Sequence, residues 1–409
     1  MRSTDVAILG AGQAGLAMSR CLSARGIDHL LIERGAVAER WRALRWAGLR
    51  LLTPNWMTRL PEHRYTGPDP DGFMTPLALV RLLEDYARPA PILDRTAVRR
   101  LSRHGGRYLL DSDAGPIRAR CVVIATGACD QPAVPPWAAD LPSRLHRLHS
   151  ADYAVPDHLP PGGVLVVGAA ATGAQIAREL HAAGREVVLA VGRHTRIPRR
   201  YRGRDIFHWL DRTGILADRW DQAANLLSAR RQPSLQLSGR GPVDLGVLSR
   251  MGVQLVGHAH GAEGARLKLS GTLAADLDAA EARCHRTLAR IDAFIDHTGL
   301  DAPADPDAWQ APDAARTGPA TLDLRGRGIG TVIFATGYRR DYGWLDLPVL
   351  DAQGELLHEG GVLPLAGLYA LGLPFLRRRS SSFIDGVGRD AVALSAHLAA
   401  TLGHRRQAA

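Results

Sequence analysis

The chain has 409 residues, 46% of them hydrophobic and 22% charged, which is the composition of a globular protein and excludes a disordered chain. A length of this order predicts two or three domains. The formal net charge of +10 comes almost entirely from arginines scattered along the chain, with Lys268 the only lysine, so we expect no nucleic-acid partner.

The cysteines and the apolar runs exclude further classes. The four cysteines form no CxxC pair, which argues against a zinc ribbon and against the dithiol of a disulfide reductase, and we expect no metal. The apolar stretch near the N-terminus is too short for a signal peptide, and no run approaches the roughly 18 residues of a membrane helix. We therefore expect a cytoplasmic protein without membrane contact.

One pattern occurs twice along the chain. The segment that starts at Asp5, DVAILGAGQAGLAMSRCLSARGIDHLLIER, aligns without a gap with the segment that starts at Gly163, GVLVVGAAATGAQIARELHAAGREVVLAVG. Each copy contains an apolar strand, a glycine turn, an amphipathic helix and a second apolar strand. The sequence therefore predicts an α/β fold with two Rossmann-like dinucleotide-binding domains.

A second pair of signals suggests how the domains are connected. The stretches CVVIATG and TVIFATG end at Gly127 and Gly337, and we expect the chain to cross between domains after each. We therefore predict a discontinuous first domain, residues 1–155 and 325–409, with a second domain, residues 156–324, inserted in it. Residues 301–320, rich in Pro, Ala and Asp, predict a surface loop. Residues 272–299 predict one long amphipathic helix in this insertion, with one apolar stripe formed by Leu273, Leu277, Ala280, Cys284, Leu288, Ile291 and Ile295.

The first glycine turn is a complete GxGxxG, formed by Gly10, Gly12 and Gly15 between a strand and a helix. Glycines at these positions permit a tight turn, a close approach to a pyrophosphate and close helix packing, while the helix N-terminus stabilises the negative charge. Glu33, 18 residues after Gly15, ends the second strand, where a carboxylate accepts hydrogen bonds from ribose hydroxyls. These features favour a dinucleotide site over a chance glycine turn.

The second turn departs from this pattern. Gly168 and Gly173 are present, but Ala170 replaces the middle glycine, and Val191 takes the position of Glu33. Arg193 follows two residues later, which suits a 2′-phosphate and favours NADPH over NADH. For the neighbouring arginines, a solvated face is the favoured interpretation; these are Arg196, Arg199 and Arg200.

The motifs together resemble the flavin-containing monooxygenase family, and more closely its bacterial branch of flavoproteins sometimes labelled as cation-transport associated. The resemblance covers nearly the whole chain and is carried by GAGQAG at Gly10, ERGAVAERW at 33–41, LLTPNWMTRLP at 51–61, HSADY at His149, FATGY at Phe334 and SSSFIDGVGRDA at 380–391. It implies that NADPH reduces FAD, that oxygen adds to flavin C4a, and that the hydroperoxide delivers one oxygen atom to a soft nucleophile or, in Baeyer-Villiger relatives, to a carbonyl.

The resemblance also implies site residues. Asn55 matches the family asparagine that faces the flavin, where its amide donates to a peroxide oxygen; a turn asparagine bonded to its own backbone is the alternative. Trp41 and Trp56 line the flavin or belong to the core. Besides the two glycine turns, Glu33 and Arg193, we assign cofactor contacts to Gln13, Ala14, Arg34, Trp41, Thr126, Gly127, Thr172, Thr336, Gly337 and Asp385.

The family's identifying motif FxGxxxHxxxY is only half present. His149 and Tyr153 keep its end, but Ser143 and Leu145 stand where Phe and Gly are expected. Tyr153 in place of Trp argues against lactone-forming chemistry. His149 is either a contact near NADP in the linker or a plain capping residue.

The predicted function is an NADPH-dependent FAD monooxygenase that acts on a small molecule and O2 by N-, S- or C-oxygenation. Two alternatives stay open: an NADPH:acceptor reductase that uses the same fold without oxygen transfer, and a non-enzymatic flavin-binding regulator. A homodimer is also left open.

Overall fold

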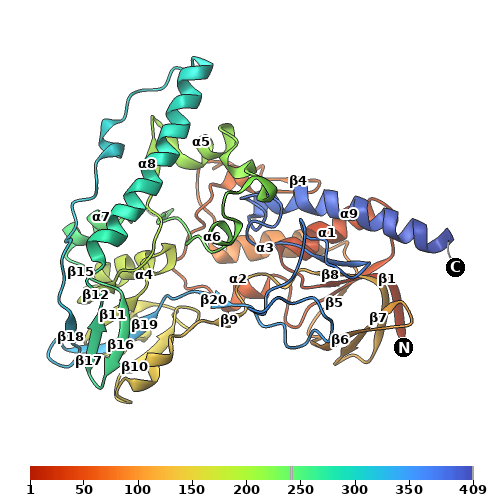
Figure 1. The fold of residues 1–409 in the computed structure, drawn as a ribbon, viewed down its shortest axis with the longest axis horizontal. Coiled ribbons are helices and arrows are strands. Elements are labelled where there is room, and N and C mark those ends of the chain that lie inside the picture. The colour runs from red at the N-terminus through yellow and green to blue at the C-terminus, as the bar shows by residue number, and fades with distance from the viewer. Residues whose placement is uncertain (240, 242, 408–409) are drawn as a thin grey trace.

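Two β-sheets, each built around one copy of the repeated pattern, organise the fold (Figure 1). The structure, a computed structural model, describes residues 1–239, 241 and 243–407. Figure 1 places the two sheets in separate lobes, with both ends of the chain in the lobe of the first sheet. The predicted α/β fold with two dinucleotide-binding units is confirmed.

The first sheet has seven strands in the order β5-β2-β1-β8-β7-β6, with β21 also paired to β8. Strand β8 is long enough to pair antiparallel with β7 through its first half and parallel with β21 through its second half. The strands are β1 (Arg2–Leu9), β2 (His29–Ile32), β5 (Ile92–Leu93), β6 (Val98–His104), β7 (Arg107–Ser112), β8 (Ile117–Ile124) and β21 (Leu368–Ala370). In the middle strands β1 and β8 the last four residues are all buried, as expected for parallel strands covered on both faces.

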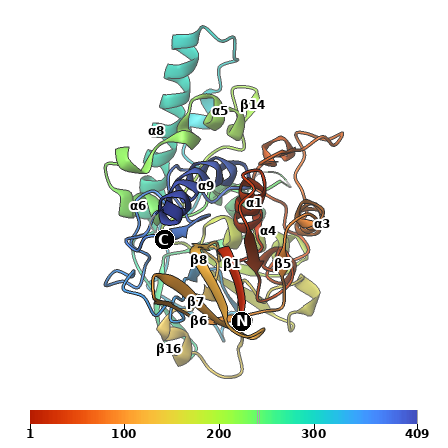
Figure 2. The ribbon, with the colours of Figure 1, turned by 90° about the vertical axis from the view of Figure 1, so that its right-hand side faces the viewer.

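Two helices that are far apart in the sequence cover one side of this sheet. Helix α1 (Gln13–Ser23) follows β1 directly, and α9 (Ile384–Gln407) packs alongside it (Figure 2). The other helices of this lobe are α2 (Glu39–Ala43) and α3 (Pro76–Ala87), which pack on each other.

The second sheet is entirely parallel, in the order β10-β19-β11-β12-β15. Its strands are β10 (His146–His149), β11 (Gly163–Val167), β12 (Val187–Ala190), β15 (Gln254–Val256) and β19 (Ile329–Phe334). Helix α4 (Ala171–Ala182) follows β11, and α7 (Leu245–Met251) precedes β15. An antiparallel sheet of β16 (Ala259–Glu263), β17 (Arg266–Leu269) and β18 (Thr321–Asp323) lies beside them.

Two strands lie outside the domain to which the sequence assigned them. Residues 1–155 and 325–409 were expected to form the first domain, yet β10 and β19 pair in the second sheet. Strand β10 reads HRLH, with one apolar residue, and β19 reads IGTVIF; neither short sequence specifies which sheet the strand joins. The short antiparallel ribbon of β9 (Gln131–Pro132) and β20 (Tyr338–Arg339) follows the two Ala-Thr-Gly stretches, and we propose that the chain crosses between the domains there.

The predicted long helix is confirmed as α8 (Leu273–Thr298). Its buried residues are those of the predicted stripe: Leu273, Leu277, Ala280, Cys284, Leu288, Ile291 and Ile295. The second half of this stripe packs in a separate core with α5 (Ile206–Arg212), away from both sheets (Figure 1). Residues 301–320 form the expected loop, apart from a 3₁₀ turn at Pro306–Trp309.

The remaining elements are short: α6 (Leu226–Arg230), the hairpins β3 (Arg59–Leu60) with β4 (His63–Arg64) and β13 (Arg200–Tyr201) with β14 (Arg204–Asp205), and further 3₁₀ turns that include η1 (Asn55–Met57), η4 (Ile215–Ala217) and η5 (Trp220–Gln222). Among the described residues, no helix is both long and apolar enough to cross a membrane.

Candidate cofactor and active site

The first glycine turn has the geometry that dinucleotide binding requires. Gly10 has φ +109°, and a Cβ there would lie 2.6 Å from the carbonyl oxygen of Ala125. A Cβ on Gly15 would overlap the carbonyl oxygen of Gly10. A Cβ on Gly12 would meet nothing within 4 Å, so Gly12 faces open space at the N-terminus of α1. Two glycines therefore serve the fold, and the middle one leaves room for a ligand.

The amides at the start of both helices are available to an anion. Gly12 and Ala170 are the N-caps of α1 and α4, with nearly the same backbone angles (φ −83° and −73°, ψ −173° and −175°), and no side chain caps either helix. The first N–H groups of each helix therefore lack a side-chain acceptor, as in helices that bind a pyrophosphate.

Glu33 lies beside the first turn. Its Oε2 accepts from the backbone N–H of Ala11 at 2.8 Å, and its Oε1 accepts from that of Gly35 at 2.9 Å. A carboxylate offers about four acceptor positions, so two remain for the hydroxyls of a ribose. The same carboxylate thus joins the glycine turn to the end of β2.

The second turn repeats the first with one substitution. Gly168 has φ +106°, and a Cβ there would lie 2.6 Å from the carbonyl oxygen of Ala335; a Cβ on Gly173 would overlap Gly168. Ala170 keeps the backbone conformation of Gly12 but adds a methyl group. Val191, at the position of Glu33, is buried and offers no acceptor to a ribose.

The two Ala-Thr-Gly stretches occupy equivalent places. Each follows the strand next to its glycine turn and lies against the first glycine of that turn. Thr126 is exposed, whereas the hydroxyl of Thr336 donates to the carbonyl oxygen of Ala133 at 2.6 Å. Gly127 and Gly337 both have positive φ, near +80°. The cofactor contacts assigned to them stay predictions.

The arginines after β12 divide into two kinds. Arg193 is exposed, and its guanidinium donates to the backbone oxygen of Arg231. Arg196 is buried and bonds to Glu281 at 2.8 Å, and Arg199 pairs with Asp205. The prediction that these arginines belong to a solvated face is therefore wrong for Arg196 and Arg199. Glu281, distant in the sequence, compensates the charge of Arg196, and Asp205, across a hairpin, compensates that of Arg199. Arg200 is exposed, as expected.

A second arginine near Arg193 was missed by sequence reasoning. Arg283, on α8, donates to the backbone oxygen of His194 at 2.6 Å, and its Nε has no partner. Burial and the nearby charge of Arg193 lower the pKa of the Arg283 guanidinium. Two cations that are close enough to repel each other fit a phosphate placed between them. In the sequence, the only signal for Arg283 is its place on the polar face of the long helix. That face carries many charged residues, so this signal does not single out Arg283.

Asn55 opens the 3₁₀ turn η1 and is buried. Its Nδ2 donates to the carbonyl oxygen of Asp69 at 2.8 Å, which orients the amide, and its Oδ1 has no hydrogen-bond partner. The side chain thus bonds a neighbouring loop rather than its own turn. Leaving a buried acceptor unpaired costs about 1–3 kcal/mol, so Oδ1 fits a donor that is supplied by a bound molecule. The donation from Asn55 to a peroxide oxygen remains a prediction.

Other predicted contacts lie around the first turn. The Nε2 of Gln13 donates to the carbonyl oxygen of Ser382 at 3.5 Å. Ala14 is buried, and a Cβ on Gly372 would lie 2.7 Å from the Cβ of Ala14. Thr172 is half-buried in the first turn of α4. The segment before α9 therefore closes over the start of α1.

Three further residues that were predicted to contact the cofactor make contacts within the protein. Arg34 pairs with Asp130 at 2.7 Å, and Trp41 is half-buried between the cores of the two lobes. Asp385 is buried and accepts from Arg59, although burial still raises the pKa of the Asp385 carboxyl. The structure shows these protein contacts, and the cofactor contacts of the same residues stay predictions.

The half-present motif lies at the junction of the lobes. His149 is buried; its Nε2 lies 2.9 Å from the carbonyl oxygen of Gly337, and its Nδ1 accepts from the N–H of Ala151. Burial lowers the pKa of His149, which favours the neutral ring, and the carbonyl at Nε2 with the N–H at Nδ1 fits a proton on Nε2. Tyr153 bonds Glu179 on α4 at 3.2 Å. Both residues hold the linker in place, and Leu145 is buried among apolar side chains.

Comparisons with known proteins agree with this architecture. Residues 7–205 match the family described as pyridine nucleotide-disulphide oxidoreductase. An uncharacterised CzcO-like oxidoreductase of Geobacillus kaustophilus is 31% identical over 392 residues, which cover 95% of this chain and 96% of that protein. The chain belongs to the CzcO-like oxidoreductases.

Solved structures show the same fold for this CzcO-like chain. A flavin-containing monooxygenase from Stenotrophomonas maltophilia aligns with a TM-score of 0.67 at 18% identity, covering 98% of this chain and 99% of that one. The bacillithiol disulfide reductase Bdr from Staphylococcus aureus aligns with a TM-score of 0.59 at 12% identity, covering 98% and 99%. The chain is thus an oxidoreductase with the fold of the flavin-containing monooxygenases.

Proposed function

We propose that this CzcO-like oxidoreductase is an NADPH-dependent, FAD-containing monooxygenase that transfers one oxygen atom from O2 to a small molecule. One observation carries the proposal: two turns of matching backbone geometry differ at the ribose position, where Glu33 stands in the first and buried Val191 in the second. Two different dinucleotides therefore fit the two sites. The flavin-containing monooxygenase and a steroid monooxygenase solved with NADP, which share this fold, support FAD and NADPH as these cofactors.

The first site fits FAD. The open space over Gly12 takes the pyrophosphate, the first amides of α1 donate to it, and Glu33 accepts from the adenosine ribose. Asn55 lies in the segment 51–61, which carries part of the family resemblance, and its buried Oδ1 is an acceptor without a hydrogen-bond partner. When bound, FAD accepts a hydride and activates oxygen.

The second site fits NADPH. Arg193 and Arg283 offer two cations at the end of β12 to the 2′-phosphate, and Val191 excludes the hydroxyl recognition that NADH requires. The methyl group of Ala170 weakens the pyrophosphate contact compared with Gly12. A weaker second site suits a cosubstrate that enters and leaves, whereas the first suits a resident cofactor.

A reductase that passes electrons to another acceptor is the second candidate. The observation that favours it is the motif around His149, in which Leu145 replaces glycine and is part of the core, so the linker lacks the flexibility that glycine provides there. The alignment with a disulfide reductase is compatible with it as fold alone.

Oxygen dependence separates the two functions. NADPH oxidation by the purified holoenzyme is followed with and without O2, together with hydrogen peroxide release and an artificial electron acceptor. A monooxygenase consumes NADPH in step with O2, and a substrate lowers the share that appears as hydrogen peroxide. Equal rates without O2, with an artificial acceptor that outpaces O2, assign the protein to the reductases.

A further inference from the structure

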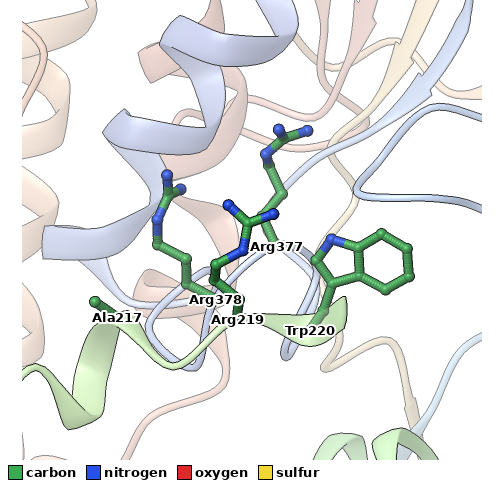
Figure 3. A pocket seen from close by; sticks show the side chains of 5 residues that line it. All are labelled: Ala217, Arg219, Trp220, Arg377 and Arg378. Carbon is green, nitrogen blue, oxygen red and sulfur yellow. The ribbon is translucent and has the colours of Figure 1, made fainter. Parts of the chain in front are cut away.

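A pocket of about 160 Å³ lies between the residues that follow α5 and the segment that precedes α9 (Figure 3). Ala217, Arg219 and Trp220 line it from one segment, and Arg377 and Arg378 from the other. Arg219 and Arg378 form an isolated antiparallel bridge, and the N–H of Trp220 donates to the carbonyl oxygen of Arg377 at 3.2 Å. The backbones therefore hold the two sides of the pocket together.

The pocket carries more positive charge than the protein compensates. Arg219 pairs with Asp221, and Arg378 bonds to the fully buried Asp390 at 2.6 Å. The guanidinium of Arg377 donates to the carbonyl oxygen of Gly360 at 2.8 Å. Among the described residues no carboxylate forms an ion pair with it, although Asp221 and Asp390, which pair with Arg219 and Arg378, act on it from farther away. A half-buried arginine without a carboxylate in direct contact is a ready site for an oxyanion, because a charge-assisted pair is stronger than a neutral hydrogen bond.

A second donor converges with Arg377. A Cβ on Gly360 would lie 3.0 Å from Nη1 of Arg377 and 3.4 Å from Nε1 of Trp220, so both donors stand over the same glycine. Among the described residues, none accepts from the indole N–H of Trp220. Figure 3 shows the three guanidinium groups pointing to the same side, with the nitrogen edge of the Trp220 ring turned toward them.

The shape of the donor set defines the ligand. Guanidinium and indole N–H groups only donate, so they recognise an acceptor that carries negative charge. The face of Trp220 adds an apolar surface for the body of the same molecule. We propose that this pocket binds the carboxylate of a small organic acid with an apolar body. The site lies apart from the two glycine turns, so the inference does not depend on the proposed function.

Direct binding tests the pocket in the holoenzyme. Titration calorimetry with 3-phenylpropionate and with its neutral amide, 3-phenylpropanamide, isolates the contribution of the carboxylate, and inorganic phosphate tests whether the pocket prefers a bare anion. We expect the acid to bind about tenfold or more tightly than the amide and more tightly than phosphate. Undetectable binding of the acid, equal affinities for acid and amide, or tighter binding of phosphate overturns the inference.

Variants tie the affinity to this pocket. Arg377→Gln keeps a donor toward Gly360 but removes the charge, and should weaken binding of the acid about ten- to a hundredfold while leaving the amide unaffected. Trp220→Phe keeps the ring and removes the N–H, and should weaken the acid several-fold. Arg99→Gln, an exposed arginine paired with Asp113 on the first sheet, is the matched control and should change nothing. Thermal unfolding checks that each variant is folded. Unchanged acid binding in Arg377→Gln refutes the site.

Discussion

Replacing Arg193 with alanine should remove much of the preference for NADPH over NADH. In the structure the guanidinium of Arg193 is exposed and donates to a single backbone oxygen, that of Arg231. Its removal therefore leaves no buried group unpaired, and the variant should fold as well as the parent. The loss then reports on the 2′-phosphate contact and not on damage to the domain.

The size of the effect follows from the exposure of Arg193. A hydrogen bond to a charged group contributes about 1.5–3 kcal/mol, and about 1.4 kcal/mol corresponds to a factor of ten. Because solvent screens an exposed pair, we expect the lower end, a loss of about tenfold in the NADPH preference. Arg283 remains to hold part of the phosphate in this variant, so Arg193→Ala together with Arg283→Gln should bring the two nucleotides close to parity.

Stopped-flow reduction of the flavin measures this preference. Anaerobic rates over a range of NADPH and NADH concentrations give the affinity and limiting rate for each. Arg200→Ala is the control, since Arg200 is exposed, lies nearby in the sequence and bonds the carbonyl oxygen of Gly203. Higher ionic strength should reduce the preference of the parent protein for NADPH over NADH. A parent that uses both nucleotides equally, or an Arg193→Ala variant with an unchanged ratio, would refute the reasoning from Val191 and Arg193.

Three further outcomes are expected. Gly12→Val should fold but purify without FAD, because its Cβ enters free space that the pyrophosphate needs, whereas Gly15→Val should fail to fold; flavin absorbance per chain and thermal unfolding separate the two. Asn55→Ala should raise the share of consumed NADPH that appears as hydrogen peroxide several-fold, and an unchanged share argues against a role for its amide. Burial lowers the pKa of His358 to about 4, so the unfolded chain binds its proton first and stability should fall as pH drops from 6.5 to 4. His358→Asn should flatten this loss, which is at most about 3 kcal/mol, in unfolding titrations across that range.

Local sequence patterns determined the two βαβ units. The constant offset between the copies puts Ala170 at the position of Gly12, and the structure shows nearly equal backbone angles at these two N-caps. The long helix α8 was also predictable with its buried stripe, because periodicity over many turns depends on residues close in sequence. The same holds for Glu33, whose distance from Gly15 follows from one helix and one strand.

Tertiary structure alone decided which sheet takes β10 and β19, and which arginines have partners. Neither HRLH in β10 nor IGTVIF in β19 specifies a sheet, and only the tertiary structure shows that both strands pair in the second one. The sequence by itself determined elements and turns, because backbone conformation and hydrophobic periodicity are set by neighbours along the chain. Charge compensation is set by neighbours in space. Arg196 pairs with Glu281 on α8, whereas Arg377 forms no direct ion pair within the described chain, and nothing in the local sequence of either arginine distinguishes them.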